Sequence, residues 1–119
     1  MFYALLIYGS ESDWRGMDRG QRARIMESHI KAVQMENDAG ALLAGFRLFP
    51  TDRATTVRAT PAGITTLDGP FAETKEQFGG FQLVSCKCLD DAIAYARQFV
   101  EHGGTVEVRP LNLDAISID

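Results

Sequence analysis

Cysteine is scarce in this sequence, and its scarcity excludes two kinds of site. The chain of 119 residues has two cysteines, Cys86 and Cys88. Residues two apart in a strand point to the same side, which is an awkward geometry for a disulfide bond between them. A zinc site of the usual kind would need a second cysteine pair, and none is present. We therefore expect two separate thiols and no metal.

A surplus of positive charge is also missing. The chain carries 16 acidic and 12 basic residues, which gives a formal net charge of −4. Binding of nucleic acid depends on a basic patch, and anionic membranes attract polybasic segments, so we expect neither as a partner. The apolar start MFYALLIYG lacks a basic leader and is too short to span a bilayer, which predicts a cytoplasmic protein. The phosphate-binding patterns GxGxxG and GxxxxGK[ST] are absent, and we expect no cofactor.

What remains is the pattern of one α+β domain over residues 1–119, since this length fits a single domain. Residues 9–17 are polar and are expected to form a loop. Asp18 and Gln21 resemble a capping box for a helix over 19–39, and Asp90 is expected to cap a second helix that ends at Gly103–Gly104. Apolar runs bounded by turn residues predict strands at 2–8, 41–49, 55–60, 63–67, 81–88 and 105–111.

Both helices show apolar residues at helical spacing, which predicts the faces that they bury against a sheet. The expected faces are Ala23, Met26, Ile30 and Val33 in the first helix, and Leu89, Ile93, Ala96 and Val100 in the second.

The order of these elements is β-α-β-(ββ)-β-α-β. Without the inserted hairpin of residues 55–67, it is the split βαβ order of a ferredoxin-like fold, βαββαβ. Such a fold has an antiparallel sheet with two helices on one face. The other face also carries apolar residues and must be covered. The simplest cover is a second copy, so we expect a homodimer through the sheet faces.

The segment DGPFAETKEQFGGF, residues 68–81, is more particular than a connector requires, and we call it the DGPF segment. Asp68-Gly69-Pro70 has the composition of a turn. The charged residues Glu73, Lys75 and Glu76 follow it and are those of either a solvated turn or a recognition site. Gly79 and Gly80 open a strand, where glycine is kept if a backbone or ligand must come close.

A site in this segment needs a partner group, and the chain has two histidines. His102 lies near the end of the second helix, where a cation is favoured for structural reasons alone. His29 lies in the middle of the first helix, at the rim of its apolar face. If His29 met Asp68, the carboxylate would orient the imidazole and raise its basicity, which makes an acid–base pair. Metal binding by His29, Asp68 and Glu73 has no supporting ligand spacing.

These residues carry a resemblance to a known family. The DGPF segment, the start MFYALLIYG, AGALLAGFRL at 39–48 and GGTVEVRPL near the end together resemble the DGPF branch of the YCII-related family. The resemblance implies a ferredoxin-like fold that dimerises through its sheets, the dimeric α/β-barrel arrangement. It also implies an active site with a histidine on the first helix, matched by His29, and an aspartate, matched by Asp68. DGPF proteins are often linked with extracytoplasmic-function sigma factors.

Three functions stay open. The first is a cofactor-independent lyase, isomerase or hydrolase in which His29 and Asp68 transfer protons. The second is a metabolite-binding or regulatory module with a sigma factor as partner. The third is a purely structural role for the DGPF segment. For either kind of ligand site, the expected substrate-binding residues are Arg47, Gly69, Pro70, Phe71, Glu73, Lys75, Gly80 and Phe81.

Overall fold

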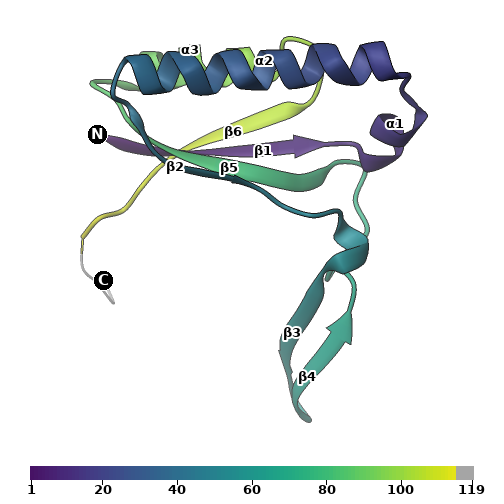
Figure 1. Cartoon of the computed structure of the whole chain (residues 1–119). Helices are drawn as coiled ribbons and strands as arrows, with labels where there is room; N and C mark the ends of the chain where they lie inside the picture. The colour runs from purple at the N-terminus through teal and green to yellow at the C-terminus, as the bar shows by residue number, and fades with distance from the viewer. Residues whose placement is uncertain (115–119) are drawn as a thin grey trace.

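The chain forms an antiparallel sheet with two long helices on one face and a β-hairpin that projects away from the other (Figure 1). The computed structural model describes residues 1–114. Its elements in chain order are β1 (Phe2–Gly9), α1 (Glu11–Gly16), α2 (Arg19–Asp38), β2 (Leu42–Arg47), the 3-10 helix η1 (Thr51–Arg53), β3 (Thr55–Thr60), β4 (Gly63–Asp68), β5 (Gln77–Ser85), α3 (Leu89–Phe99) and β6 (Thr105–Pro110).

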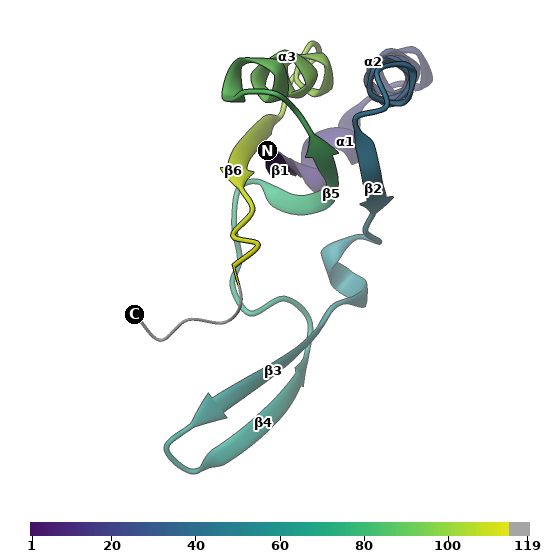
Figure 2. The ribbon, with the colours of Figure 1, turned by 90° about the vertical axis from the view of Figure 1, so that its left-hand side faces the viewer.

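The main sheet has the strand order β2-β5-β1-β6, and its strands pair antiparallel throughout. Strands β3 and β4 pair with each other in a separate two-stranded sheet, and we call this hairpin the arm. Figure 2 shows the arm extending well away from the sheet. The expected ferredoxin-like α+β fold with an inserted hairpin is confirmed.

The first helix of the chain, α1, was not expected, because residues 9–17 were predicted to be a loop. Its start is fixed by Ser10, whose side chain accepts a hydrogen bond of 3.1 Å from the backbone N–H of Asp13. Glu11 and Asp13 lie in its first turn, where negative charge favours a helix. The polar residues that suggested a loop are therefore the capping residues of a short helix.

The start and end of α2 were predicted correctly. The Asp18 carboxylate accepts a hydrogen bond of 2.8 Å from the N–H of Gln21, and the Gln21 side chain accepts one of 3.0 Å from the N–H of Asp18. These two bonds form the expected capping box. Beyond the helix, Gly40 adopts a φ of 67°, a conformation that glycine reaches at little cost.

The buried face of α2 was predicted wrongly. Ala23 is exposed and Ile30 is 54% exposed, whereas the buried residues are Ser28, Ala32 and Glu36. The helix has apolar side chains around much of its circumference, so periodicity alone does not select the inward face. Small and hydrogen-bonded side chains bring the helix close to its neighbours: Ser28, for example, donates to the Glu101 carboxylate over 3.3 Å.

The start of α3 also differs from the prediction. Cys88 occupies the N-cap position without a side-chain hydrogen bond, and Asp90 lies within the first turn instead of capping the helix. Cys86 is buried and Cys88 is exposed, and both are free thiols. The residues that α3 buries are Ala92, Ala96 and Phe99, of which the sequence pattern had indicated Ala96.

Strand β5 begins earlier than expected and includes Gly79 and Gly80. A Cβ atom on Gly80 would lie 2.7 Å from the carbonyl oxygen of Phe46 in β2. Glycine was expected here to let a backbone or a ligand come close. This is confirmed at Gly80, where the close group is the backbone of Phe46. The pairing of β1 with β5 shifts register at these glycines, because Ile7 pairs with Gly80 and Tyr8 with Phe78, which leaves Gly79 as the extra residue of β5.

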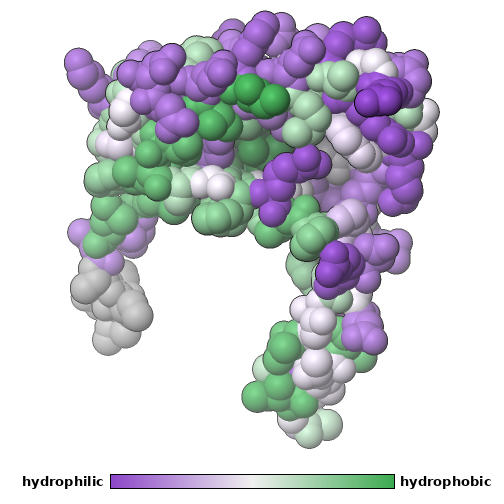
Figure 3. All heavy atoms as spheres, viewed as in Figure 1, coloured by the Kyte–Doolittle hydropathy of each residue, from purple (hydrophilic) through white to green (hydrophobic). Residues whose placement is uncertain are grey.

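The face of the sheet without helices, which we call the open face, carries paired aromatic side chains. Phe46 and Phe81 lie 5.9 Å apart between ring centroids, and Tyr8 and Phe78 lie 5.4 Å apart. Phe46 is 66% exposed. Apolar residues continue onto the arm, where Val57, Ile64 and Leu67 are all exposed, and Figure 3 shows hydrophobic surface on the arm.

Within residues 1–114, no helix has the length and apolar character needed to cross a membrane.

Candidate functional site

The turn of the DGPF segment is held by residues at and just before the start of β3. Gly69 adopts a φ of 97°, which requires glycine in practice. Its N–H donates to the Ala54 carbonyl over 2.7 Å, and its own carbonyl accepts from the Thr56 hydroxyl over 2.7 Å. Asp68, the last residue of β4, is exposed, and its carboxylate makes no hydrogen bond with the described part of the chain. Within residues 1–114, the hydrogen bonds that hold the turn are therefore those of Gly69 and do not involve the Asp68 side chain.

The second half of the segment forms one wall of an open hollow of about 600 Å³. The opposite wall is the start of α1, and η1 closes one side. The lining residues are Ser10, Glu11, Ser12, Asp13, Arg15, Thr51, Glu73, Thr74, Lys75, Glu76 and Gln77. Of the substrate-binding residues expected from the sequence, the hollow brings together Glu73 and Lys75.

Glu11 joins the three segments that line the hollow. Its carboxylate accepts hydrogen bonds from the backbone N–H of Thr51 over 2.8 Å and from the Thr51 hydroxyl over 2.9 Å. The N–H of Glu11 donates to the side-chain oxygen of Gln77 over 2.8 Å, and the Gln77 amide nitrogen donates to the carbonyl of Thr74 over 2.6 Å. This network holds the walls in place before any ligand arrives. No pattern in the sequence marks Glu11 or Gln77.

The hollow is polar and carries both signs of charge. Its lining includes the acidic residues Glu11, Asp13, Glu73 and Glu76 together with the basic residues Arg15 and Lys75. Such a lining favours a small molecule with several hydrogen-bonding groups over an apolar one. Among residues 1–114, no three histidine, cysteine or acidic residues are placed to hold a metal ion.

The remaining segment residues expected to bind substrate lie away from the hollow. Phe71 is 76% exposed beyond the turn, and Phe81 is half-buried on the open face against Phe46. Pro70 is exposed next to Gly69, and Gly80 is buried between strands. Phe71 and Phe81 thus do not wall a common pocket within one chain.

His29 lies on the opposite side of the sheet from the arm. Its ring packs against Phe99 of α3 with 5.1 Å between centroids. Helices α2 and α3 both lie on the face of the sheet opposite to the arm (Figure 1). Burial lowers the pKa of His29, hydrogen bonding to the backbone of Phe99 offsets part of that change, and the charge of Arg47 lowers the pKa further. Within one chain, the structure does not bring His29 and Asp68 together.

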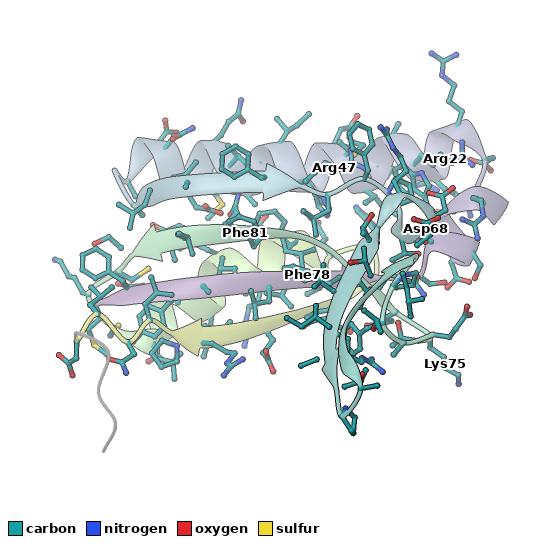
Figure 4. All side chains as sticks on the ribbon, turned by 90° about the horizontal axis from the view of Figure 1, so that it is seen from below. Arg22, Arg47, Asp68, Lys75, Phe78 and Phe81 are labelled. Atoms are coloured by element: carbon teal, nitrogen blue, oxygen red, sulfur yellow. The ribbon has the colours of Figure 1, made fainter. Side chains whose placement is uncertain are left out.

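Arg47 lies at the end of β2, on the same side of the sheet as His29. Its guanidinium carbon is 6.0 Å from the ring centroid of Trp14, and that of Arg22 is 5.6 Å from the same ring. Figure 4 labels both arginines along the edge formed by α2 and β2. The sequence pointed to Arg47 but not to Trp14 or Arg22, which come from a stretch predicted to be a loop and from the first turn of α2.

The sequence of the chain is similar to known proteins over nearly its whole length. A sequence model of the YCII-related domain matches residues 1–112. The chain belongs to the YCII-related family. An uncharacterised protein from Rhizobium meliloti (strain 1021) is 41% identical over 117 residues, covering 95% of this chain and 94% of that protein. The resemblance noted from the sequence is confirmed at the level of the family.

Proposed function

We propose that this YCII-related protein binds a small polar metabolite in the hollow between the start of α1 and the DGPF segment. The observation that carries the proposal is the fixed geometry of the hollow. Glu11 and Gln77 tie its walls to each other, so that Glu73 and Lys75 project from a braced loop and not from a free one. Preorganised polar groups lose less entropy on binding than mobile ones.

A screen by thermal shift tests this proposal. The probes are amino acids, sugars and nucleosides, which combine several hydrogen-bonding groups with small size. A binder should raise the melting temperature of the wild type, and the shift should be lost in Lys75→Ala. Lys31→Ala is the matched control, since Lys31 is exposed on α2, and it should keep the shift. A binder unaffected by Lys75→Ala and Glu73→Gln would show that the hollow is not its site.

We also propose that the protein is a homodimer through its open face. Phe46 and Phe78 are 66% and 37% exposed there, and exposed apolar surface continues onto the arm. An isolated two-stranded hairpin is marginally stable in water, so the arm gains most from a surface that covers it. A second copy offers apolar surface of the same kind by two-fold symmetry.

Sedimentation of two variants tests the dimer. Phe46→Asp places a charge on the open face and should give a monomer. Ile30→Asp places the same charge on α2, where Ile30 is 54% exposed, and should stay dimeric. A monomeric wild type, or a dimer unaffected by Phe46→Asp, would contradict the proposed interface.

Proton-transfer catalysis by His29 and Asp68 is the second candidate function. It is favoured by the lowered pKa of His29, because an uncharged imidazole can accept a proton at neutral pH. The two residues lie on opposite sides of the sheet in one chain, so the pair requires Asp68 from another protomer. A lyase, isomerase or hydrolase of this kind should lose turnover in His29→Ala while the variant keeps its fold.

The binding proposal also allows a regulatory role. In that role, a ligand in the hollow controls the binding of a partner such as a sigma factor. Such a partner would bind the exposed arm, with Val57, Ile64 and Leu67. It would then compete with the second copy of the chain for the same surface. Capture of a sigma factor from the native cell by the wild type, but not by Ile64→Asp, is the expected result. Equal capture by the variant would argue against the arm as the contact.

A further inference from the structure

We propose a second ligand site, separate from the hollow, in which Arg22, Trp14 and Arg47 bind an oxyanion such as a carboxylate or a phosphate. It lies where α1, the first half of α2 and the end of β2 meet, on the helix side of the sheet. It does not depend on the function proposed for the hollow.

The first argument is the convergence of two cations on one ring. The guanidinium carbons of Arg22 and Arg47 lie 5.6 Å and 6.0 Å from the centroid of the Trp14 ring. Within residues 1–114, the one ion pair is that of Glu107 with Arg109, so neither guanidinium at Trp14 has a carboxylate within 4.0 Å. The two like charges lie against the same ring and repel each other, and a bound anion would relieve that repulsion.

The second argument is that Arg22 is held in place. Its Nε donates to the carbonyl of Trp14 over 2.9 Å, and its Nη2 donates to the carbonyl of Arg15 over 3.0 Å. A guanidinium has five N–H donors, so these two bonds leave three for a ligand. The Arg22 side chain is therefore already ordered in the free protein, and ligand binding adds little further loss of its conformational entropy.

The third argument concerns Arg47, which uses one of its donors in a hydrogen bond within residues 1–114. Its Nη1 contacts the Met26 sulfur at 3.4 Å, and sulfur is a weak acceptor. The planar fork of an arginine fits the two oxygens of a carboxylate or phosphate, which makes an oxyanion the class of ligand that this arrangement recognises. The Trp14 ring adds a flat apolar surface against which the body of the ligand can pack.

The chain supplies its own probe for the test, because Trp14 is its single tryptophan. The experiment titrates inorganic phosphate and benzoate into the full chain and follows tryptophan fluorescence, with ionic strength held constant by chloride. At least one oxyanion should cause a saturable change. In Arg47→Gln the dissociation constant should rise by about tenfold or more, the usual effect of losing a charged hydrogen-bond donor.

Two controls separate a lost site from a lost fold or a general charge effect. Arg58→Gln removes an exposed arginine from the arm and should bind as the wild type does. Circular dichroism of Arg47→Gln should match the wild type, because Arg47 is exposed. Arg47→Lys keeps the charge without the fork and should bind with intermediate strength.

A second readout is the pKa of His29, which the charge of Arg47 lowers. Binding of an anion beside Arg47 should raise the pKa of His29, which NMR can follow, because the cation that lowers it is then neutralised. Binding of only one of the two oxyanions supports the site and identifies the class of ligand. Absence of saturable binding by both, or equal binding by wild type and Arg47→Gln, would overturn the proposal.

Discussion

Glu36 and Gln82 form a carboxyl–amide pair in the core, between α2 and β5. Glu36 is completely buried and Gln82 is 5% exposed. With its nitrogen turned toward α2, the Gln82 amide donates to both carboxylate oxygens of Glu36. Gly45 on the neighbouring strand makes room for this side chain, because a Cβ atom there would lie 3.1 Å from the Gln82 Cγ. The Gln82 amide gives the Glu36 carboxylate its hydrogen-bond donors, but it carries no positive charge to offset the negative charge of the carboxylate.

The first prediction is that Glu36 makes folding stability fall as pH rises. Burial raises the pKa of Glu36 from 4.5 to about 7. Between these values the folded chain keeps a proton that the unfolded chain has lost, so the free energy of unfolding decreases with pH and levels off above about 7. The full decrease is on the order of 3 kcal/mol, since one pKa unit corresponds to about 1.4 kcal/mol.

Glu36→Gln removes this decrease, because an amide carries no charge at any pH. Urea denaturation at several pH values should show the variant close to the wild type near pH 4.5 and more stable at pH 8. Glu27→Gln changes an exposed residue on the same helix and should leave the pH profile of the wild type intact. A Glu36→Gln profile that still falls with the wild-type slope would place the titrating group elsewhere.

The second prediction concerns the two adjacent glycines of β5. Gly80→Ala should destabilise the fold by about 1–3 kcal/mol, the usual cost of overpacking, because the new methyl group would meet the Phe46 carbonyl at 2.7 Å. Gly79→Ala is the matched control, since the nearest atom to a Cβ there is 3.9 Å away. Chemical denaturation compares the two, and equal losses would mean that the contact with Phe46 does not decide the requirement for glycine.

The elements were predictable where the decisive chemistry is local. The capping box of Asp18 and Gln21 is formed by neighbours in the sequence, and the positive φ that the turn needs is supplied by Gly69 itself; the structure has both. The α2 face was not predictable in the same way, because it depends on which residues find partners across the core. Glu36 looks like a surface residue until Gln82 of β5 lies beside it.

The candidate sites were predictable only in part, because tertiary contacts assemble them. Glu11 and Thr51, which brace the hollow, are 40 residues apart in the sequence. Trp14 and Arg47 come from α1 and β2, and no sequence pattern in either stretch predicts that the two residues are in contact. The DGPF segment was recognisable as unusual, and the structure divides it into a turn, a wall of the hollow and the start of a central strand.

The third prediction addresses the expected acid–base pair. Asp68→Asn should leave the pKa of His29 unchanged if each protomer acts alone, because the sheet separates the two residues. Arg47→Gln should raise that pKa, because the guanidinium charge contributes to its lowering. An NMR titration of the His29 ring protons measures both changes, and the Arg47 variant shows that the measurement is sensitive enough.

A shift of the His29 pKa in Asp68→Asn would carry a specific meaning. The two residues lie on opposite sides of the sheet within one chain, so an Asp68 from another protomer would be the first explanation. In that event the effect should disappear in Phe46→Asp, which is expected to be monomeric. Loss of coupling in the monomer would then support catalysis at a site shared between subunits, and persistence of the shift would show that Asp68 acts on His29 by a rearrangement within one chain.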